Sequence, residues 1–160
     1  MTAIELLEMQ HREAERLFDL VRASRGSEKR EAFEELADLL ALHAEVEERN
    51  FYPVIELHAI DRVLDDSFED HAEIKRRLAH LVKLGPAAVA FDARLDELNV
   101  RLDAHVAEEE DTLFPEAEQL LDPDQLIALA QEMVATMVSL AKAAEAPRLY
   151  VLHDTDTAGL

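Results

Sequence analysis

Apolar residues recur every three or four positions along most of this chain, which is the spacing of one face of an α-helix. Short breaks that contain glycine, proline or acidic residues separate five such stretches. The stretches predict helices at about 4–21, 33–54, 64–81, 91–113 and 126–140. The pattern therefore predicts an all-α protein.

Local signals indicate where these helices begin and end. Thr2 and Glu5 have the spacing of a capping box, and Asp122-Pro123 with Gln125 is typical of a capped helix start. The residues expected to end or kink a helix are, in chain order, Gly26, Pro53, Gly85 with Pro86, and Pro115.

Four helices of about 20 residues joined by short loops are expected to pack as an antiparallel, up-down four-helix bundle about 30 Å long. The additional C-terminal helix is expected to cover a flank or an end of the bundle. No low-complexity linker divides the chain, so residues 1–146 are predicted to form one domain. Residues 147–160 lack a periodic pattern and are predicted to form a loosely packed tail.

The chain repeats a short polar pattern within its apolar stripes. The segments HAEVEERNFYP at 43–53 and HVAEEEDTLFP at 105–115 each place a histidine four residues before a glutamate. Positions four apart lie on one face of a helix, so each pair can face the same point inside the bundle. Single histidines precede the two pairs on the apolar stripes of the first and third helices. The six residues are His11, His43, Glu47, His71, His105 and Glu109.

Buried carboxylates require a compensating cation, and no lysine or arginine is assigned to these stripes. Histidine and carboxylate ligands without sulfur suit iron or manganese, with zinc as an alternative. Six protein ligands are too many for one tetrahedral ion, but they fit two ions if Glu47 and Glu109 each bridge. Two such ions would keep positions open for water, hydroxide, oxide or a small ligand.

Composition and charge exclude several function classes. The net charge is −20, which would repel phosphate backbones and anionic membranes. Cysteine is absent, which excludes disulfides, thiolate ligands and thiol catalysis. We found no secretory signal and no stretch of about 20 apolar residues, so a soluble cytoplasmic protein without nucleic-acid or membrane partners is expected.

The ordered pattern His, His-x-x-x-Glu, His, His-x-x-x-Glu on four successive helices resembles the hemerythrin-like (HHE cation-binding) domain family over about residues 1–145. The aromatic-proline pairs Tyr52-Pro53 and Phe114-Pro115 resemble it too. The resemblance implies a cofactor of two iron ions, ferrous or ferric, with a bridging oxo or hydroxo group. It also implies that His11 and His43 bind one iron, that His71 and His105 bind the other, and that Glu47 and Glu109 bridge them.

One position departs from the oxygen-carrying members of that family, which have a further histidine one turn after the ligand on the third helix. The residue here is Lys75, a cation at neutral pH, which weakens the case for reversible oxygen carriage. Glu15 and Glu108 are the nearest candidates to complete the coordination, and Glu48 and Glu73 are weaker ones.

The resemblance implies a non-haem di-iron protein that binds or reacts with O2, NO or H2O2. Catalase-like or peroxidase-like decomposition of peroxide and oxygen or redox sensing are both open. One alternative is an iron-binding or iron-sensing protein without turnover, and another is a metal-free acidic bundle that binds a basic partner. A monomer and a homodimer both fit the sequence.

Other histidines are expected to be uninvolved. His80 should face solvent because it lies about half a turn around the helix from His71, while His58 and His153 lie outside the periodic stretches. A single His-x-x-x-Glu pair is often only a surface ion pair. The repetition of the pair in phase with two apolar stripes favours ligands.

Overall fold

The computed structural model describes residues 1–57 and 61–144, and every element within them is helical. Four long helices form the bundle: α1 (Ala3–Ala23), α2 (Gly26–Val46), α4 (Asp61–Leu84) and α5 (Phe91–Glu108). Two π-helical turns, η1 (Glu47–Phe51) and η2 (Glu109–Leu113), extend α2 and α5 into the short helices α3 (Tyr52–Glu56) and α6 (Phe114–Leu120). Helix α7 (Pro123–Ala143) follows. The prediction of an up-down bundle with an additional helix is confirmed.

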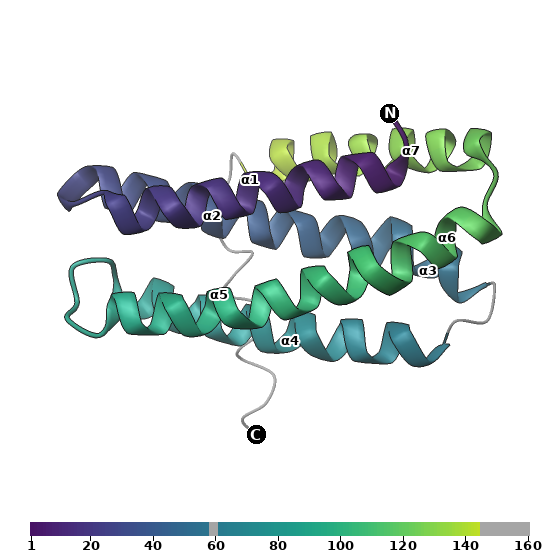
Figure 1. Cartoon of the computed structure of the whole chain (residues 1–160). Coiled ribbons are helices and arrows are strands. Elements are labelled where there is room, and N and C mark those ends of the chain that lie inside the picture. The colour runs from purple at the N-terminus through teal and green to yellow at the C-terminus, as the bar shows by residue number, and fades with distance from the viewer. Residues whose placement is uncertain (58–60, 145–160) are drawn as a thin grey trace, which may run out of the picture.

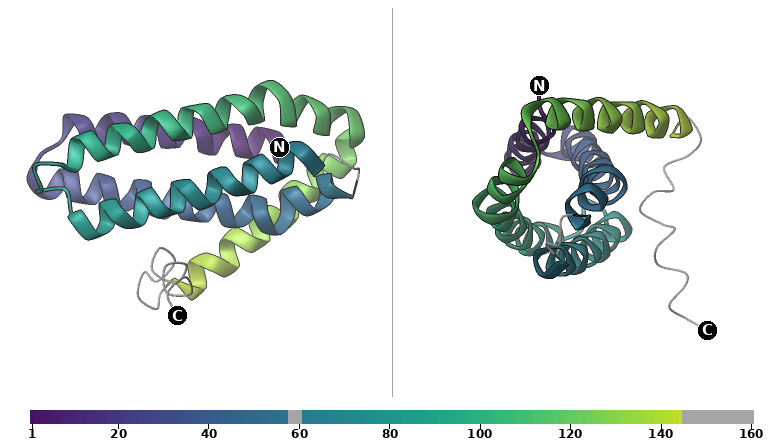
Figure 2. Two further views of the ribbon diagram at one scale, coloured as in Figure 1. Left: turned by 90° about the horizontal axis from the view of Figure 1, so that it is seen from below. Right: turned by 90° about the vertical axis from the view of Figure 1, so that its right-hand side faces the viewer.

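The bundle consists of two antiparallel hairpins, α1 with α2 and α4 with α5 (Figure 1). The view along the bundle axis shows the four helices as a ring, with α7 crossing outside it (Figure 2). Helix α7 packs against α1, α2 and η1, so it covers one flank. The site must therefore be sought inside the ring.

The helix ends follow the local signals in most places. Thr2 and Asp122 both form the predicted capping boxes, with Glu5 and Gln125 respectively. The turn after α1 ends at Gly26, whose φ of 57° places it in the left-handed region that only glycine adopts without strain. The predicted stop at Pro115 was wrong, because helical structure continues to Leu120.

Proline is accommodated by the π-helical turns. Pro53 and Pro115 lie in the first turn of α3 and α6, where their missing N–H costs no hydrogen bond. The turn before each proline closes by an i+5 hydrogen bond, from the Tyr52 N–H to the Glu47 carbonyl and from the Phe114 N–H to the Glu109 carbonyl. Each helix thus continues in the same direction through the proline, while its side-chain register shifts by one residue.

The apolar core forms two clusters with a polar layer between them. One cluster includes Leu7, Val46, Leu64 and Phe114 at the α3–α6 end of the bundle. The other includes residues of all four long helices at the opposite end, namely Phe18, Leu36, Leu78 and Leu95 among others. All four predicted ligand histidines fall in sequence between the segments that supply these two clusters. The fold therefore encloses the polar layer between two apolar plugs.

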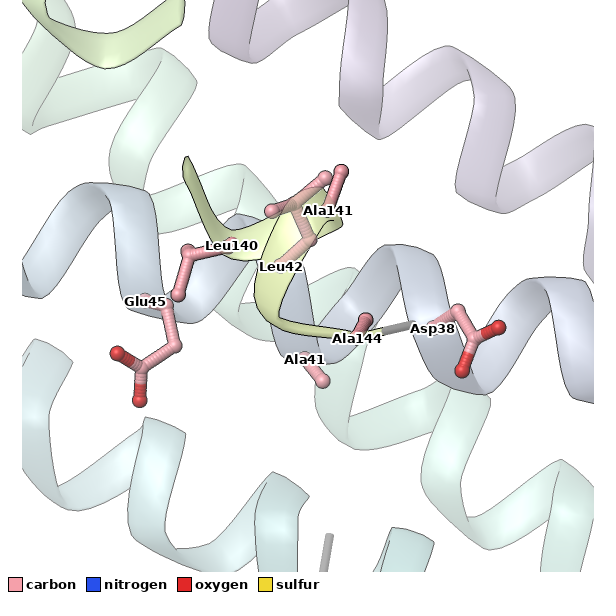
Figure 3. A pocket seen from close by; sticks show the side chains of 7 residues that line it. All are labelled: Asp38, Ala41, Leu42, Glu45, Leu140, Ala141 and Ala144. Carbon is pink, nitrogen blue, oxygen red and sulfur yellow. The ribbon is translucent and has the colours of Figure 1, made fainter. Parts of the chain in front are cut away.

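Helix α7 changes one expectation. By length and composition it could cross a membrane, with a mean hydropathy of 1.4, although sequence reasoning found no such stretch. This is weak evidence, because core helices of soluble proteins pass the same test. A groove of about 380 Å³ lies where the end of α7 passes α2 (Figure 3), lined mainly by alanine and leucine side chains with Asp38 and Glu45 at its edge.

The structure does not describe residues 58–60 or 145–160. The predictions for His58, for His153 and for the tail at 147–160 lie outside the described residues, and the domain boundary at residue 146 stays a prediction. His80 is exposed, as expected.

Candidate metal centre

The six predicted ligands meet in the polar layer at the middle of the bundle. His11 comes from α1, His43 from α2, His71 from α4 and His105 from α5, while Glu47 and Glu109 are the first residues of the two π-helical turns. All six are buried, with exposed fractions between 0% and 5%. Burying six ionisable side chains together is costly unless hydrogen bonds or a bound cation compensate them.

The inward-facing atoms form two groups that share both glutamates. One group contains His11, His43, Glu47 and Glu109, and the other contains His71, His105 and the same two glutamates. Within each group the ligand atoms lie within 4.8 Å of one another. Each group can hold a metal ion, and the two carboxylates lie where they can contact both ions.

Ring nitrogens and carboxylate oxygens lie at closely similar spacings around the centre. His11 Nε2 lies 3.3 Å from Glu109 Oε2, and His43 Nε2 lies 3.2 Å from Glu47 Oε2. His71 Nε2 lies 3.1 Å from Glu47 Oε2 and also 3.1 Å from His105 Nε2. A cation about 2.1 Å from two donors at right angles would hold them roughly 3.0 Å apart, so the spacing suits a cation.

Three of the four rings are oriented by an outer hydrogen bond from Nδ1. His11 donates to Glu110 Oε1 at 2.9 Å, His43 to Gln10 Oε1 at 2.8 Å and His71 to Glu48 Oε1 at 2.9 Å. Because an amide or carboxylate oxygen can only accept, each Nδ1 must carry the proton. In the neutral form of each ring, Nε2 then has a free lone pair that faces the centre, as metal-binding histidines require.

Cations outside the bundle core hold two of the outer carboxylates in place. Arg12 lies 2.9 Å from Glu110 Oε2, and the Lys75 ammonium lies 3.2 Å from both oxygens of Glu48. Each series of polar contacts therefore runs from a partly exposed cation, through a carboxylate, to a buried imidazole. This arrangement orients His11 and His71 without bringing a positive charge into the centre.

Several inward atoms make no hydrogen bond, and they fit a metal ion. Among the described residues, these include His11 Nε2, His43 Nε2, Glu47 Oε1 and Glu109 Oε2. A buried lone pair that faces another lone pair is unfavourable unless a proton or a cation lies between them. The donor set, its spacing and its orphaned atoms are all consistent with bound cations.

Tyr52 is a fifth inward side chain on the His71 side, in addition to the four residues of that ligand group. Its hydroxyl lies 2.8 Å from Glu109 Oε1, 3.1 Å from His71 Nε2 and 3.3 Å from Glu47 Oε2. The π-helical turn produces this position, because it places residue 52 rather than residue 51 in register with Glu47. The equivalent residue Phe114 stacks on His11 instead, with ring centroids 5.7 Å apart.

Burial and neighbouring charges perturb the ionisable groups. Burial lowers the pKa of His71, but the Glu47 and Glu48 carboxylates outweigh it and raise the pKa to about 9. Burial raises the pKa of Glu47, yet His43 and His71 hold it well below its ordinary 4.5. Burial and the nearby carboxylates raise the pKa of the Tyr52 hydroxyl, which therefore stays protonated.

These shifts predict how the metal-free protein responds to pH. The folded-state pKa of His71, about 9, lies above the ordinary 6.5 expected when unfolded, so its proton stabilises the fold fully below pH 6.5. This stabilisation should fall by up to about 1.4 kcal/mol per pH unit as the pH rises toward 9. The pKa of His11, where Glu109 and Glu47 overcome the effect of burial, is also raised and acts in the same direction. Urea unfolding of chelator-treated protein at pH 7 and pH 9 measures the difference.

The His71→Gln variant is the control for this prediction, because it should flatten the dependence on pH. An unfolding free energy that rises between pH 7 and pH 9 would contradict the assignment of a protonated His71 to the metal-free form.

The extra ligands suggested by the sequence are not at the centre. Glu15 and Glu108 are exposed, so the suggestion that they complete the coordination was wrong. Glu73 pairs with Arg76 and Arg77 at the surface. Glu48 contacts His71 on its outer side, so it orients a ligand and is not placed as one.

Sequence reasoning did not identify the residues that face the outer side of the rings in this role, although a signal was present. Gln10 and Asp70 directly precede the single histidines, and Glu48 and Glu110 directly follow the two inward glutamates. The same repeat that relates the ligands therefore relates these partners. Their contacts cross between helices, which a periodicity along one helix does not reveal.

A groove of about 270 Å³ lies between α1 and α5 and is lined in part by His11. His11 and Glu110 lie at it, and Ala107 and Asp103 of α5 line its wall. The groove therefore borders His11, one member of the first ligand group.

Comparison with known proteins agrees with this geometry. Residues 2–117 match the model of the hemerythrin HHE cation binding domain. The chain belongs to this family. As a hemerythrin HHE domain, it is one of a family described as cation-binding, and it has buried histidine and glutamate groups that can hold a metal.

Two individual proteins resemble this hemerythrin HHE domain. A hemerythrin HHE cation binding domain-containing protein from Mycobacterium kansasii has a crystal structure that matches with a TM-score of 0.82 at 20% identity, over 96% of this chain and 98% of that one. A protein of Nostoc sp. named a DNA nickase is 28% identical over 136 residues, which are 84% of this chain. This chain spans only 39% of the length of that relative.

Proposed function

We propose that this hemerythrin HHE domain is a non-haem di-iron protein that binds or reacts with O2, NO or peroxide. The observation that carries the proposal is the pair of buried four-ligand groups that share Glu47 and Glu109. Histidine and carboxylate ligands without sulfur suit iron. Bound iron would supply one-electron redox change between ferrous and ferric and open positions for a small ligand.

The residues of the chain have definable tasks in such a reaction. His11, His43, His71 and His105 would hold the metals from four helices, and their outer partners fix the ring orientations. Tyr52 holds a proton at its hydroxyl, 2.8 Å from Glu109 Oε1, where it can be donated within the site. The apolar clusters above and below exclude bulk water from the centre.

Decomposition of peroxide is the turnover that we propose to test first. Two molecules of H2O2 would yield two of water and one of O2, which an oxygen electrode records. Iron-loaded wild-type protein should evolve O2, and the Glu47→Gln variant should not. Glu108→Gln is a matched control, since it removes the same charge from an exposed position next to Glu109, outside the groove between α1 and α5, and should behave as wild type.

If iron-loaded protein evolves no O2 and its optical spectrum is unchanged by peroxide and by NO, a reaction with small oxygen species is contradicted. An iron-bound but inert protein would instead support iron binding or sensing without turnover.

The groove between α1 and α5 predicts a route for small ligands. Replacing Ala107 with phenylalanine should fill the groove and slow NO binding to iron-loaded protein several-fold, while the iron content stays the same. Ala104→Phe is the control, because Ala104 is on the same helix but lines a different surface groove with Arg77 and Val100. Equal stopped-flow rates for both variants would show that the route lies elsewhere.

The DNA-nicking activity named for the Nostoc relative is not proposed for this chain. Its net charge of −20 would repel a phosphate backbone, and the region of similarity is a minor part of that relative.

A further inference from the structure

The two halves of the centre are related by the internal repeat, and two of the equivalent positions at which they differ lie directly beside the histidine rings. Residue 10 corresponds to residue 70, and residue 114 corresponds to residue 52. Gln10 and Phe114 lie beside the His11–His43 group, whereas Asp70 and Tyr52 lie beside the His71–His105 group. The outer glutamates, Glu110 and Glu48, are the same in both halves. At these two positions the His71–His105 half has a carboxylate and a hydroxyl, where the His11–His43 half has an amide and a phenyl ring.

The His43 ring has an uncharged partner. Its Nδ1 donates to the Gln10 amide oxygen at 2.8 Å, and Gln10 is itself held by a contact of its Nε2 with Met137 Sδ of α7 at 3.7 Å. An amide oxygen orients the ring, but it does little to increase the electron density at Nε2.

The His105 ring faces a carboxylate instead. Asp70 Oδ2 lies 3.6 Å from His105 Nδ1, and Arg101 holds the other Asp70 oxygen at 2.5 Å. His105 Nδ1 makes no hydrogen bond at this distance, so the interaction is Coulombic. When Nε2 gives its lone pair to a cation, the Nδ1–H bond becomes more polar and its attraction to the carboxylate grows. A carboxylate partner thus makes His105 the stronger ligand.

Tyr52 adds to the same asymmetry. Its hydroxyl lies among the His71, Glu47 and Glu109 ligand atoms, and the phenyl ring of Phe114 occupies the equivalent place in the other half. The half with Asp70 therefore also has one more oxygen atom near the cation position.

We propose that the two cation positions are unequal, that the position between His71 and His105 fills first, and that Asp70 in place of the equivalent Gln10 is the main positioning residue behind the difference. This inference rests on the proposed function, because it requires both positions to bind a cation.

Opposite charge changes at the two outer residues test the inference on the full chain. Metal-free protein is titrated with Co²⁺ and followed by calorimetry and by visible absorption. Wild-type protein should bind in two separable steps. Asp70→Asn should weaken the first step by roughly 10–100-fold, the usual cost of losing an outer partner, and bring the two steps together. Gln10→Glu should tighten the second step and leave the first unchanged.

The gain expected from Gln10→Glu separates positioning from a merely structural role, since a damaged fold would not bind more tightly. A crystal grown with one equivalent of Co²⁺ should show anomalous density between His71 and His105. Density between His11 and His43, or two equal steps that neither substitution alters, would overturn the inference alone. Failure of wild-type protein to take up any Co²⁺ would contradict the proposed function as well.

Discussion

Replacing Glu47 with glutamine should abolish binding of both cations rather than one. The Glu47 carboxylate belongs to both ligand groups, and its Oε2 lies 3.2 Å from His43 Nε2 and 3.1 Å from His71 Nε2. An amide of the same shape carries no charge, so each position loses an anionic ligand. The loss of affinity should exceed the roughly 10–100-fold cost of removing an outer partner. Elemental analysis after dialysis measures the remaining metal.

Two controls make this result specific. Glu15→Gln and Glu108→Gln remove the same charge from exposed positions close to His11 and Glu109, so both should retain wild-type metal content. Glu109→Gln should reproduce the effect of Glu47→Gln, because Glu109 is shared in the same way. Retention of one cation in either inward variant would show that the glutamates do not bridge.

Chelation should lower the melting temperature of the wild-type protein markedly. Without cations, the buried Glu47 and Glu109 depend on protonated histidines for charge compensation, which is weaker because burial opposes the charged imidazoles. With free cation about 100 times the dissociation constant, each bound ion adds roughly 2.7 kcal/mol to the free energy of unfolding. Since about 1 kcal/mol shifts the melting temperature by roughly 2–4 °C at this size, a decrease of about 5–10 °C per ion is expected.

Calorimetry with and without chelator measures this decrease. The Glu47→Gln variant supplies the internal reference, because a protein that binds no cation should melt at the same temperature in both conditions. Identical melting temperatures for metal-loaded and metal-free wild-type protein would contradict coupling between metal binding and folding.

The sequence was sufficient to predict the architecture and the six inward residues. Each ligand lies in phase with the apolar stripe of its own helix, so periodicity alone places His11 or His105 on an inward face. The four-residue spacing then brings Glu47 and Glu109 to the same depth as their histidines. Burial of all six residues follows from helix geometry, which is local information.

The rest of the site depends on contacts that local patterns do not determine. Pro53 and Pro115 were expected to kink or end their helices, but a one-residue register shift in the preceding π-helical turn accommodates both. That shift turns Tyr52 toward His71, which a regular helix would not predict. The contacts of Glu48 with His71 and of Gln10 with His43 join different helices, so they appear only when the helices are packed.

Lys75 shows how an outer residue can be misjudged from sequence. Its position one turn after His71 suggested only a missing ligand. In the structure its ammonium group lies 3.2 Å from Glu48, which in turn accepts the hydrogen bond of His71 Nδ1. The lysine therefore belongs to the set of residues that orient His71, with one quarter of its side chain exposed.

The metal content of protein purified from iron-supplemented cells tests the central claim most directly. Elemental analysis should find close to two equivalents of iron in wild-type protein and in Glu15→Gln, and almost none in the His43→Ala/His105→Ala double variant. Wild-type protein that retains its helical content by circular dichroism but contains no iron, or a double variant with wild-type iron content, would contradict the dimetal centre.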